Sequence, residues 1–306
     1  MATGGSKKAI VAALLANLGI AVAKFVGFLI TRASSMLAES VHSLADSGNQ
    51  GLLLFGANRA TRAATPEHPF GYGRLRYFWS FVVAVVLFAL GSLFSLFEGV
   101  HKLAHPEPIE SVGVAVAILV VSIGLETLSF RTAIVEANHV RRGVGWWAFI
   151  RHAKVPELPV VLLEDLGALV GLILALTGVA LTAITGNPVW DAYGTLSIGV
   201  LLGIIAAILA VEMHSLLIGE SAAAADVRAI RAAIEGCDGV VGLLHLKTQH
   251  LGPEELLVAG KVQLDPQLSF PRVVDTIDAA EARVRQAVPS ARVMYLEPDV
   301  AAPVGA

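Results

Sequence analysis

The sequence contains little charge and almost no cysteine. Only 15% of its 306 residues are charged and 55% are hydrophobic, whereas about a quarter of the residues in an ordinary soluble domain are charged. The formal net charge of −3 leaves no basic excess to neutralise phosphates, which argues against a nucleic-acid partner. The one cysteine, Cys237, excludes an intramolecular disulfide and a CxxC thiolate cluster. The low charge and the high hydrophobic content favour a membrane protein.

Long apolar runs take the place of the missing charge. A helix needs about 20 apolar residues to cross a bilayer. The first run follows Lys7 and Lys8 and lacks the short apolar core and cleavage site of a signal peptide, so we expect an uncleaved first helix. Six stretches reach the required length, and the sequence therefore predicts six transmembrane helices: Ala9–Ile30, Met36–Ala57, Tyr77–Val100, Val112–Val135, Leu158–Ala183 and Ala192–Leu216.

Basic residues are concentrated in alternate connections between these helices. The connections after the second and fourth helices and the segment before the first are rich in them, whereas the others carry only Arg32 and Lys102. The positive-inside rule then places both termini in the cytoplasm, and in a bacterium the membrane would be the inner cell membrane. The residues concerned are Lys7, Lys8, Arg59, Arg62, Arg74, Arg76, Arg141, Arg142, Arg151 and Lys154.

The end of the chain has a different periodicity and predicts a second domain. We expect residues 1–218 to form the six-helix transmembrane domain and residues 219–306 a small cytoplasmic α+β domain with the element order αββαβ. Gly252 and Pro253 mark the turn between its first two strands. The expected elements are a helix at Asp226–Glu235, strands at Val240–His250 and Leu256–Asp265, a helix at Phe270–Ala287 and a strand at Arg292–Glu297.

The second predicted helix carries polar residues where lipid should permit none. Glu39, His42, Asp46, Asn49 and Gln50 fall on one stripe roughly 100° wide, at about 100° per residue. Each ionisable group at a helix centre costs about 2.5–3.5 kcal/mol to insert, so several together need a common partner. A bound cation would be such a partner. His42 and Asp46 are four residues apart, and imidazole nitrogen and carboxylate oxygen are both good zinc ligands.

The fifth predicted helix contains a second acidic pair, Glu164 and Asp165, between apolar residues. A site shared by the second and fifth helices is therefore possible. For Lys24 in the first helix we favour snorkelling or pairing with a carboxylate, and for Glu126 and Arg131 in the fourth we favour pairing with each other or with an adjacent helix.

Histidines outside these helices give weaker signals. His68 follows Glu67 in a loop with two prolines and two glycines, where an ion site and an ordinary solvated loop explain it equally well. His245 and His250 are five residues apart on a predicted strand, so they would face opposite sides and would not share a metal ion.

Two motifs closely resemble the cation diffusion facilitator family. They are SMLAESVHSLAD at residues 35–46 and HPFGYGR at residues 68–74. A branch of the family that includes zinc transporter nine is similar in four further strings: SLADSGNQ at 43–50, HPEPIE at 105–110, LLED at 162–165 and ITGNP at 184–188. The resemblance covers nearly the whole chain.

The resemblance implies a homodimer with six helices and a ferredoxin-like cytoplasmic domain in each protomer, which exports zinc or a similar ion in exchange for protons. It implies that His42, Asp46 and Asp165 bind the ion. Many members carry another ligand at the position of Val161, and the resemblance to the branch suggests Glu164 as the fourth ligand instead. Asn49, on the stripe of the second helix, is a further candidate. Only His68 matches the loop site of other members, and Leu244, Gly260 and Tyr295 stand where some relatives have histidines in the tail.

The predicted mechanism is alternating access, with protons and metal competing for the same side chains. Zinc is the first candidate, and Mn²⁺, Fe²⁺, Co²⁺ and Cd²⁺ remain open because nitrogen and oxygen ligands do not order them by themselves. We expect no catalytic residue and no bound cofactor. Two alternatives remain: a transport-dead relative that acts as a regulator or scaffold, and an intramembrane metalloenzyme, for which no HExxH pattern is present.

Overall fold

The structure is a computed structural model that describes residues 4–141 and 143–299, with side chains described from residue 17 onward except at residue 88. It divides into two compact units. The first contains the chain up to Asn58 together with Phe78–Met213, and the second contains Arg59–Tyr77 together with the chain from His214.

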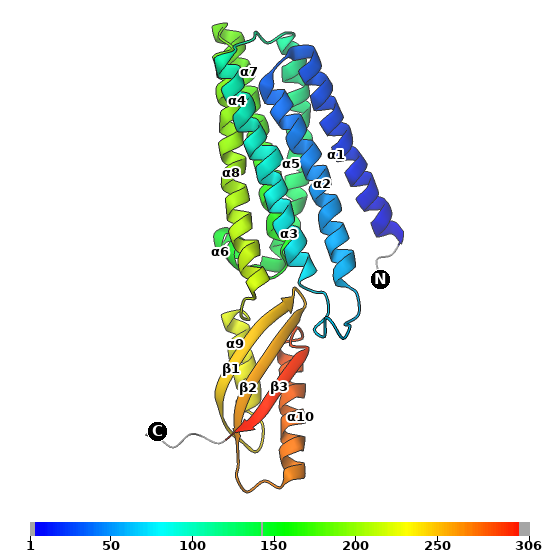
Figure 1. Cartoon of the computed structure of the whole chain (residues 1–306), viewed down its shortest axis with the longest axis vertical. Coiled ribbons are helices and arrows are strands. Elements are labelled where there is room, and N and C mark those ends of the chain that lie inside the picture. Colours follow the sequence, from blue (N-terminus) through cyan, green and yellow to red (C-terminus); the bar gives the residue numbers. More distant parts are fainter. Residues whose placement is uncertain (1–3, 142, 300–306) are drawn as a thin grey trace, which may run out of the picture. The chain divides into compact units, whose positions relative to one another are not determined.

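Long helices make up the first unit (Figure 1). The third predicted span is one continuous helical rod that contains a π-helical segment, η1, which the sequence analysis did not anticipate. The short helix α6 was also missed. The elements are α1 (Gly4–Thr31), α2 (Ser34–Ala60), α3 (Leu75–Val86), η1 (Leu87–Leu93), α4 (Phe94–Ala104), α5 (Val112–Arg141), α6 (Trp146–His152), α7 (Glu157–Thr185) and α8 (Val189–Ile218).

Four helices in the described part of the chain are long and apolar enough to cross a membrane: Leu75–Ala104, Val112–Arg141, Glu157–Thr185 and Val189–Ile218. Helix α2 has 27 residues, but its polar stripe lowers its hydropathy. For α1, the described apolar part is the shorter segment Asn17–Thr31. The prediction of six spans therefore stays a prediction for these two helices.

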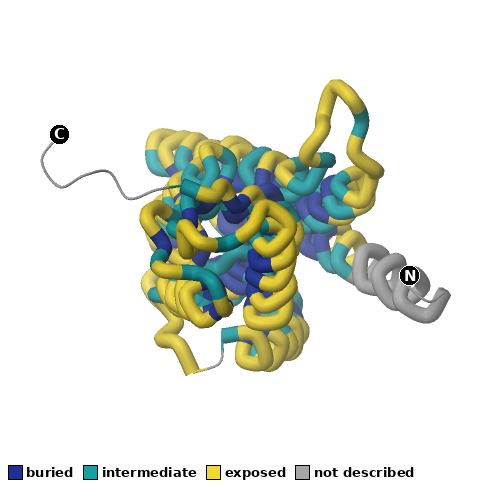
Figure 2. Tube along the Cα trace, turned by 90° about the horizontal axis from the view of Figure 1, so that it is seen from below, coloured by how far each residue is buried: buried dark blue, intermediate teal, exposed yellow. Residues whose placement is uncertain are grey.

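The outer surfaces of the helices are apolar. Large hydrophobic side chains such as Phe97, Val121 and Leu128 are 68%, 63% and 62% exposed. Figure 2 shows exposed residues on the outward sides of helices and buried ones on the inward sides. Apolar surface exposed on this scale is normally covered by a partner protein or by a membrane. Lipid around membrane-spanning helices would cover these side chains.

Asp191 of α8 joins the beginnings of two helices. Its carboxylate accepts hydrogen bonds from the backbone N–H groups of Ser34 (2.8 Å) and Ser35 (3.3 Å) at the start of α2, and from both serine hydroxyls. The first N–H groups of a helix have no partner within the helix and attract negative charge. Asp191 also lies in the first turn of α8. One buried carboxylate therefore accepts hydrogen bonds at the start of α2 and places a negative charge at the start of α8.

The second unit contains a three-stranded sheet with the order β1-β2-β3. Strands β1 (Val240–Gly252) and β2 (Glu255–Leu264) are antiparallel, and β3 (Val293–Asp299) runs parallel to β2. With α9 (Ala224–Glu235) and α10 (Phe270–Ala287), the element order is the αββαβ that the sequence predicts. Alternate residues of β2 are buried, and Val258 and Val262 pack in one core with Ile230 of α9 and Val284 of α10.

The loop between α2 and α3 folds against the β1–β2 turn within this unit. A Cβ atom added to Gly73 would lie 2.8 Å from the carbonyl oxygen of Leu251, and one added to Gly252 would lie 2.9 Å from the Cα of Gly73. Both partners are backbone atoms, which cannot turn away as a side chain can. The two backbones therefore approach so closely that only glycine fits at both positions.

Candidate metal site

The polar stripe of α2 lies inside the helical unit, where Asp46 and Gln50 are partly buried and the other members are buried. His42 and Asn49 are fully buried, and the Nδ1 atom of His42 lies 3.5 Å from Oδ1 of Asp46. Neither ring nitrogen of His42 has a hydrogen-bond partner, nor has Oδ1 of Asp46. Because buried polar atoms are normally paired, these atoms are available to a ligand.

Helix α7 supplies the second acidic pair. Oε1 of Glu164 accepts a hydrogen bond of 2.6 Å from Nδ2 of Asn49, and Oδ2 of Asp165 accepts one of 3.0 Å from the hydroxyl of Ser129 on α5. The Asn49 contact links α2 to α7, and the Ser129 contact links α5 to α7. The predicted site residues of the second and fifth spans therefore belong to one connected cluster.

A small cavity lies within this cluster and brings four carboxylates to one place. Three of them, Asp46, Glu164 and Asp165, were singled out from the sequence, whereas Glu126 of α5 was expected to have a pairing role. The signal for Glu126 was its position near the middle of an apolar span. Helices α1, α2, α5 and α7 all contribute to the lining, which consists of Asn17, Ile20, Ser43, Asp46, Gln50, Glu126, Ser129, Glu164 and Asp165.

Among the described residues, no three histidine, cysteine, aspartate or glutamate side chains are placed so that they could hold one metal ion together. Zinc ligands sit about 2.0–2.3 Å from the ion, so the side chains around the cavity would have to move closer to bind one. The assignment of His42, Asp46, Glu164 and Asp165 as ligands stays a prediction.

Glu39 pairs with a lysine, whereas its place on the polar stripe suggested that it shares a cation with His42 and Asp46. Its Oε2 atom accepts a hydrogen bond of 3.1 Å from the ammonium group of Lys24 on α1, and both side chains are fully buried. Helical periodicity placed Glu39 on the face of His42, but the neighbouring helix at that level presents a lysine. Pairing with a carboxylate is one of the two roles that the sequence suggested for Lys24, the other being snorkelling.

His68 belongs to the second compact unit, whereas His42, Asp46 and Asp165 belong to the first. Its ring stacks on Tyr72 with centroids 4.6 Å apart, and its backbone N–H donates to the carbonyl oxygen of Thr65. These contacts are those of an ordered, exposed loop. A metal site at His68 stays a prediction.

Glu164→Gln is expected to weaken Zn²⁺ binding by about tenfold while the protein stays folded. The amide oxygen of glutamine can still accept the hydrogen bond from Asn49, so the unfolding free energy should change by less than about 1 kcal/mol, whereas the charge offered to the ion is lost. Equilibrium Zn²⁺ binding and thermal unfolding of the purified protein in detergent measure both effects. Unchanged affinity with lower thermal stability would assign Glu164 to structural pairing.

The chain matches family models over most of its length. The model described as the cation efflux transmembrane domain matches residues 10–218, and the model described as the cytoplasmic domain of cation efflux proteins matches residues 222–295.

Curated relatives include the mitochondrial proton-coupled zinc antiporter SLC30A9 of Homo sapiens, 34% identical over 81% of this chain and 43% of its own length. The metal tolerance protein C4 of Arabidopsis thaliana is 29% identical over 86% of this chain and 58% of its own. The chain therefore spans about half the length of these relatives. Among solved structures, the nickel form of a MamM C-terminal domain variant is 19% identical and covers 26% of this chain and 98% of that one, with a TM-score of 0.24.

Proposed function

From the premise that this chain belongs to the cation efflux family of transporters, which are not enzymes, we propose that it carries a divalent transition-metal ion, zinc first, across a membrane in exchange for protons. The name of the human relative, a proton-coupled zinc antiporter, supports both the ion and the coupling.

The observation that carries this proposal is the cavity between α1, α2, α5 and α7. Four carboxylates line it, and His42 lies beside Asp46 with unpaired ring nitrogens. Carboxylates within membrane spans are expensive and mark ion pathways. In our proposal His42, Asp46 and Asp165 bind the ion, and Glu164 and Asn49 complete the site. Protons compete with the metal because ligands must be deprotonated to bind it.

The proposed architecture has six membrane spans in residues 1–218 and a cytoplasmic, ferredoxin-like domain in residues 219–306. The αββαβ order and the match to the cytoplasmic family domain support the second assignment. The arrangement of basic residues supports cytoplasmic termini. We further propose alternating access around the cavity and a homodimer, with the bacterial inner membrane as one possible location.

Flux measurements test the function directly. In proteoliposomes with an imposed pH gradient, we expect the purified protein to move Zn²⁺ against the direction of proton flow, and a panel of Mn²⁺, Fe²⁺, Co²⁺ and Cd²⁺ to rank the substrates. A pH gradient that drives no metal movement for any ion of the panel would contradict the proposal.

A further inference from the structure

Lys24 is a positive charge buried in the helical unit. Its side chain is fully buried, and its ammonium group donates to Oε2 of Glu39 at 3.1 Å and to the hydroxyl of Ser43 at 2.7 Å. A lysine within a membrane span is costly. Such a residue is expected to have a function beyond joining two helices.

The Ser43 contact places this charge next to the candidate metal site. Ser43 lines the cavity together with Asp46 and Glu126, so the residue that accepts this hydrogen bond from Lys24 is itself part of the cavity lining.

Glu39 of α2 pairs with Lys24 and also lies against α7. Its Oε2 atom faces the lysine, while Oε1 is buried without a hydrogen-bond partner. A Cβ atom at Gly171 of α7 would come 2.5 Å from that Oε1 atom, so the missing side chain at Gly171 makes room for the carboxylate. Glu39 does not line the cavity, whereas Ser43, whose hydroxyl Lys24 contacts, does.

We propose that Lys24 is a positioning residue that weakens metal binding in the cavity and so speeds release of the ion. The inference rests on the proposed function. Four carboxylates in a poorly solvated site would hold a divalent cation strongly, because Coulomb energies rise as the effective dielectric constant falls. A transported ion must bind well enough to enter and weakly enough to leave. A fixed positive charge bound to a cavity-lining residue lowers the affinity for the ion without occupying a ligand position.

The test compares Lys24→Met with Lys24→Arg in proteoliposomes. For Lys24→Met we expect the KM for Zn²⁺ to fall by about tenfold, since the substitution removes the Coulomb repulsion between the ammonium group and the ion, and the maximal flux to fall as well. Lys24→Arg keeps the charge and should restore both values to within about twofold. Lys102→Met is the matched control, because Lys102 is another buried lysine, bound to the carbonyl oxygen of Arg32 at 3.0 Å.

The direction of the KM change separates this role from a structural one. A lysine that only joined α1 to α2 would, when removed, loosen the site and raise KM. An unchanged or raised KM in Lys24→Met would therefore overturn the inference. If that variant does not fold, Lys24→Met combined with Glu39→Gln removes both charges of the ion pair, so Glu39 is not left as an unpaired buried charge, and it should lower KM by a smaller factor. Absence of metal flux in the wild-type protein would instead contradict the proposed function.

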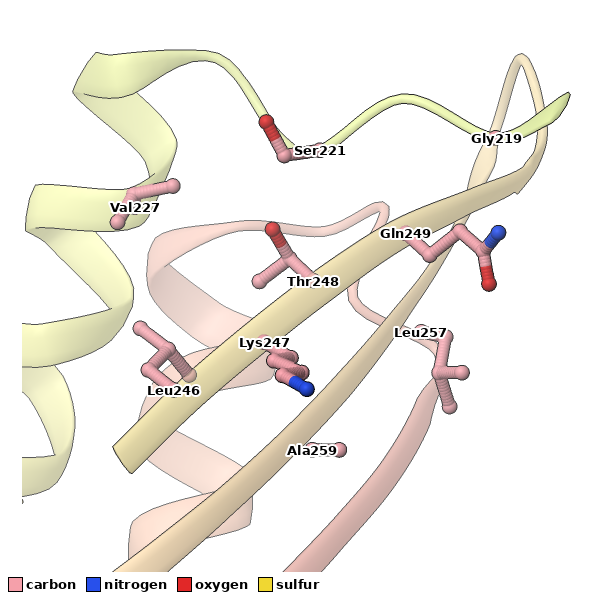
Figure 3. Close-up of a pocket in the computed structure, with 9 residues that line it drawn as sticks. All are labelled: Gly219, Ser221, Val227, Leu246, Lys247, Thr248, Gln249, Leu257 and Ala259. Atoms are coloured by element: carbon pink, nitrogen blue, oxygen red, sulfur yellow. The ribbon is translucent and has the colours of Figure 1, made fainter. Parts of the chain in front are cut away.

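A second cavity lies in the C-terminal domain, beside β1 and the start of α9. It is lined by apolar residues such as Val227 and Leu246 and by polar ones such as Lys247 and Thr248 (Figure 3). The side chains around it do not converge on one point in Figure 3, and we assign it no ligand.

Discussion

Asp46→Ala is expected to reduce metal flux to background, below about 1% of the wild-type rate. Asp46 contributes a carboxylate to the cavity and lies 3.5 Å from the nearest ring nitrogen of His42. Groups that merely orient metal ligands typically change affinity by about 10–100-fold when lost, so loss of a ligand should exceed that range. His42→Ala should have a comparable effect. Zinc flux in proteoliposomes, with protein insertion quantified, measures both variants.

The control for these variants is Glu136→Ala, which removes an exposed carboxylate from α5 and should leave flux unchanged. Each variant must also elute at the same size as the wild type, which shows that the loss comes from the site and not from unfolding. Wild-type flux in both Asp46→Ala and His42→Ala would disprove the assignment of the α2 stripe to the ion.

Asp191→Ala is expected to destabilise the helical unit by about 3 kcal/mol or more. The substitution leaves two backbone N–H groups and the Ser35 hydroxyl at the start of α2 without their acceptor, whereas the Ser34 hydroxyl keeps Thr195 as a partner. A buried group that loses its partner costs about 1–3 kcal/mol, and more when the partner was charged. Favourable interaction of the carboxylate with two helix N-termini is lost as well. Thermal unfolding in detergent, followed by circular dichroism, measures the effect.

Two comparisons show whether the carboxylate itself is responsible. Asp191→Asn keeps one acceptor oxygen and should lose less stability than Asp191→Ala. Asp226→Ala removes an acidic residue from the first turn of α9 and should change the unfolding midpoint little. Equal midpoints for Asp191→Ala and the wild type would show that water or other groups satisfy the start of α2.

The helices were predictable because lipid imposes a simple rule on length and hydropathy. The runs Val112–Val135 and Leu158–Ala183 lie wholly within α5 and α7, and the order of the C-terminal elements follows from a change between two periods. Helical periodicity also placed His42 and Asp46 on one face. Each of these predictions depends only on residues close together in the sequence.

The partners of the polar residues could not be predicted in the same way. Periodicity assigns Glu39 to a face of α2 but does not say that Lys24 of α1 lies opposite it. The cavity position of Glu126 and the Asn49–Glu164 hydrogen bond depend on how α2, α5 and α7 pack. The role of Asp191 is also long-range, since it contacts Ser34, which is 157 residues away.

The close approach of Gly73 and Gly252 has a mechanical consequence. The loop that joins α2 to α3 lies in the same compact unit as the β1–β2 turn, and α2 carries His42 and Asp46. The chain thus passes between the two units three times, after Asn58, before Phe78 and after Met213. A hinge motion between the units would have to bend the backbone at all three crossings at once. Because one crossing follows directly from α2, such a motion would apply force to the helix that carries the proposed metal ligands.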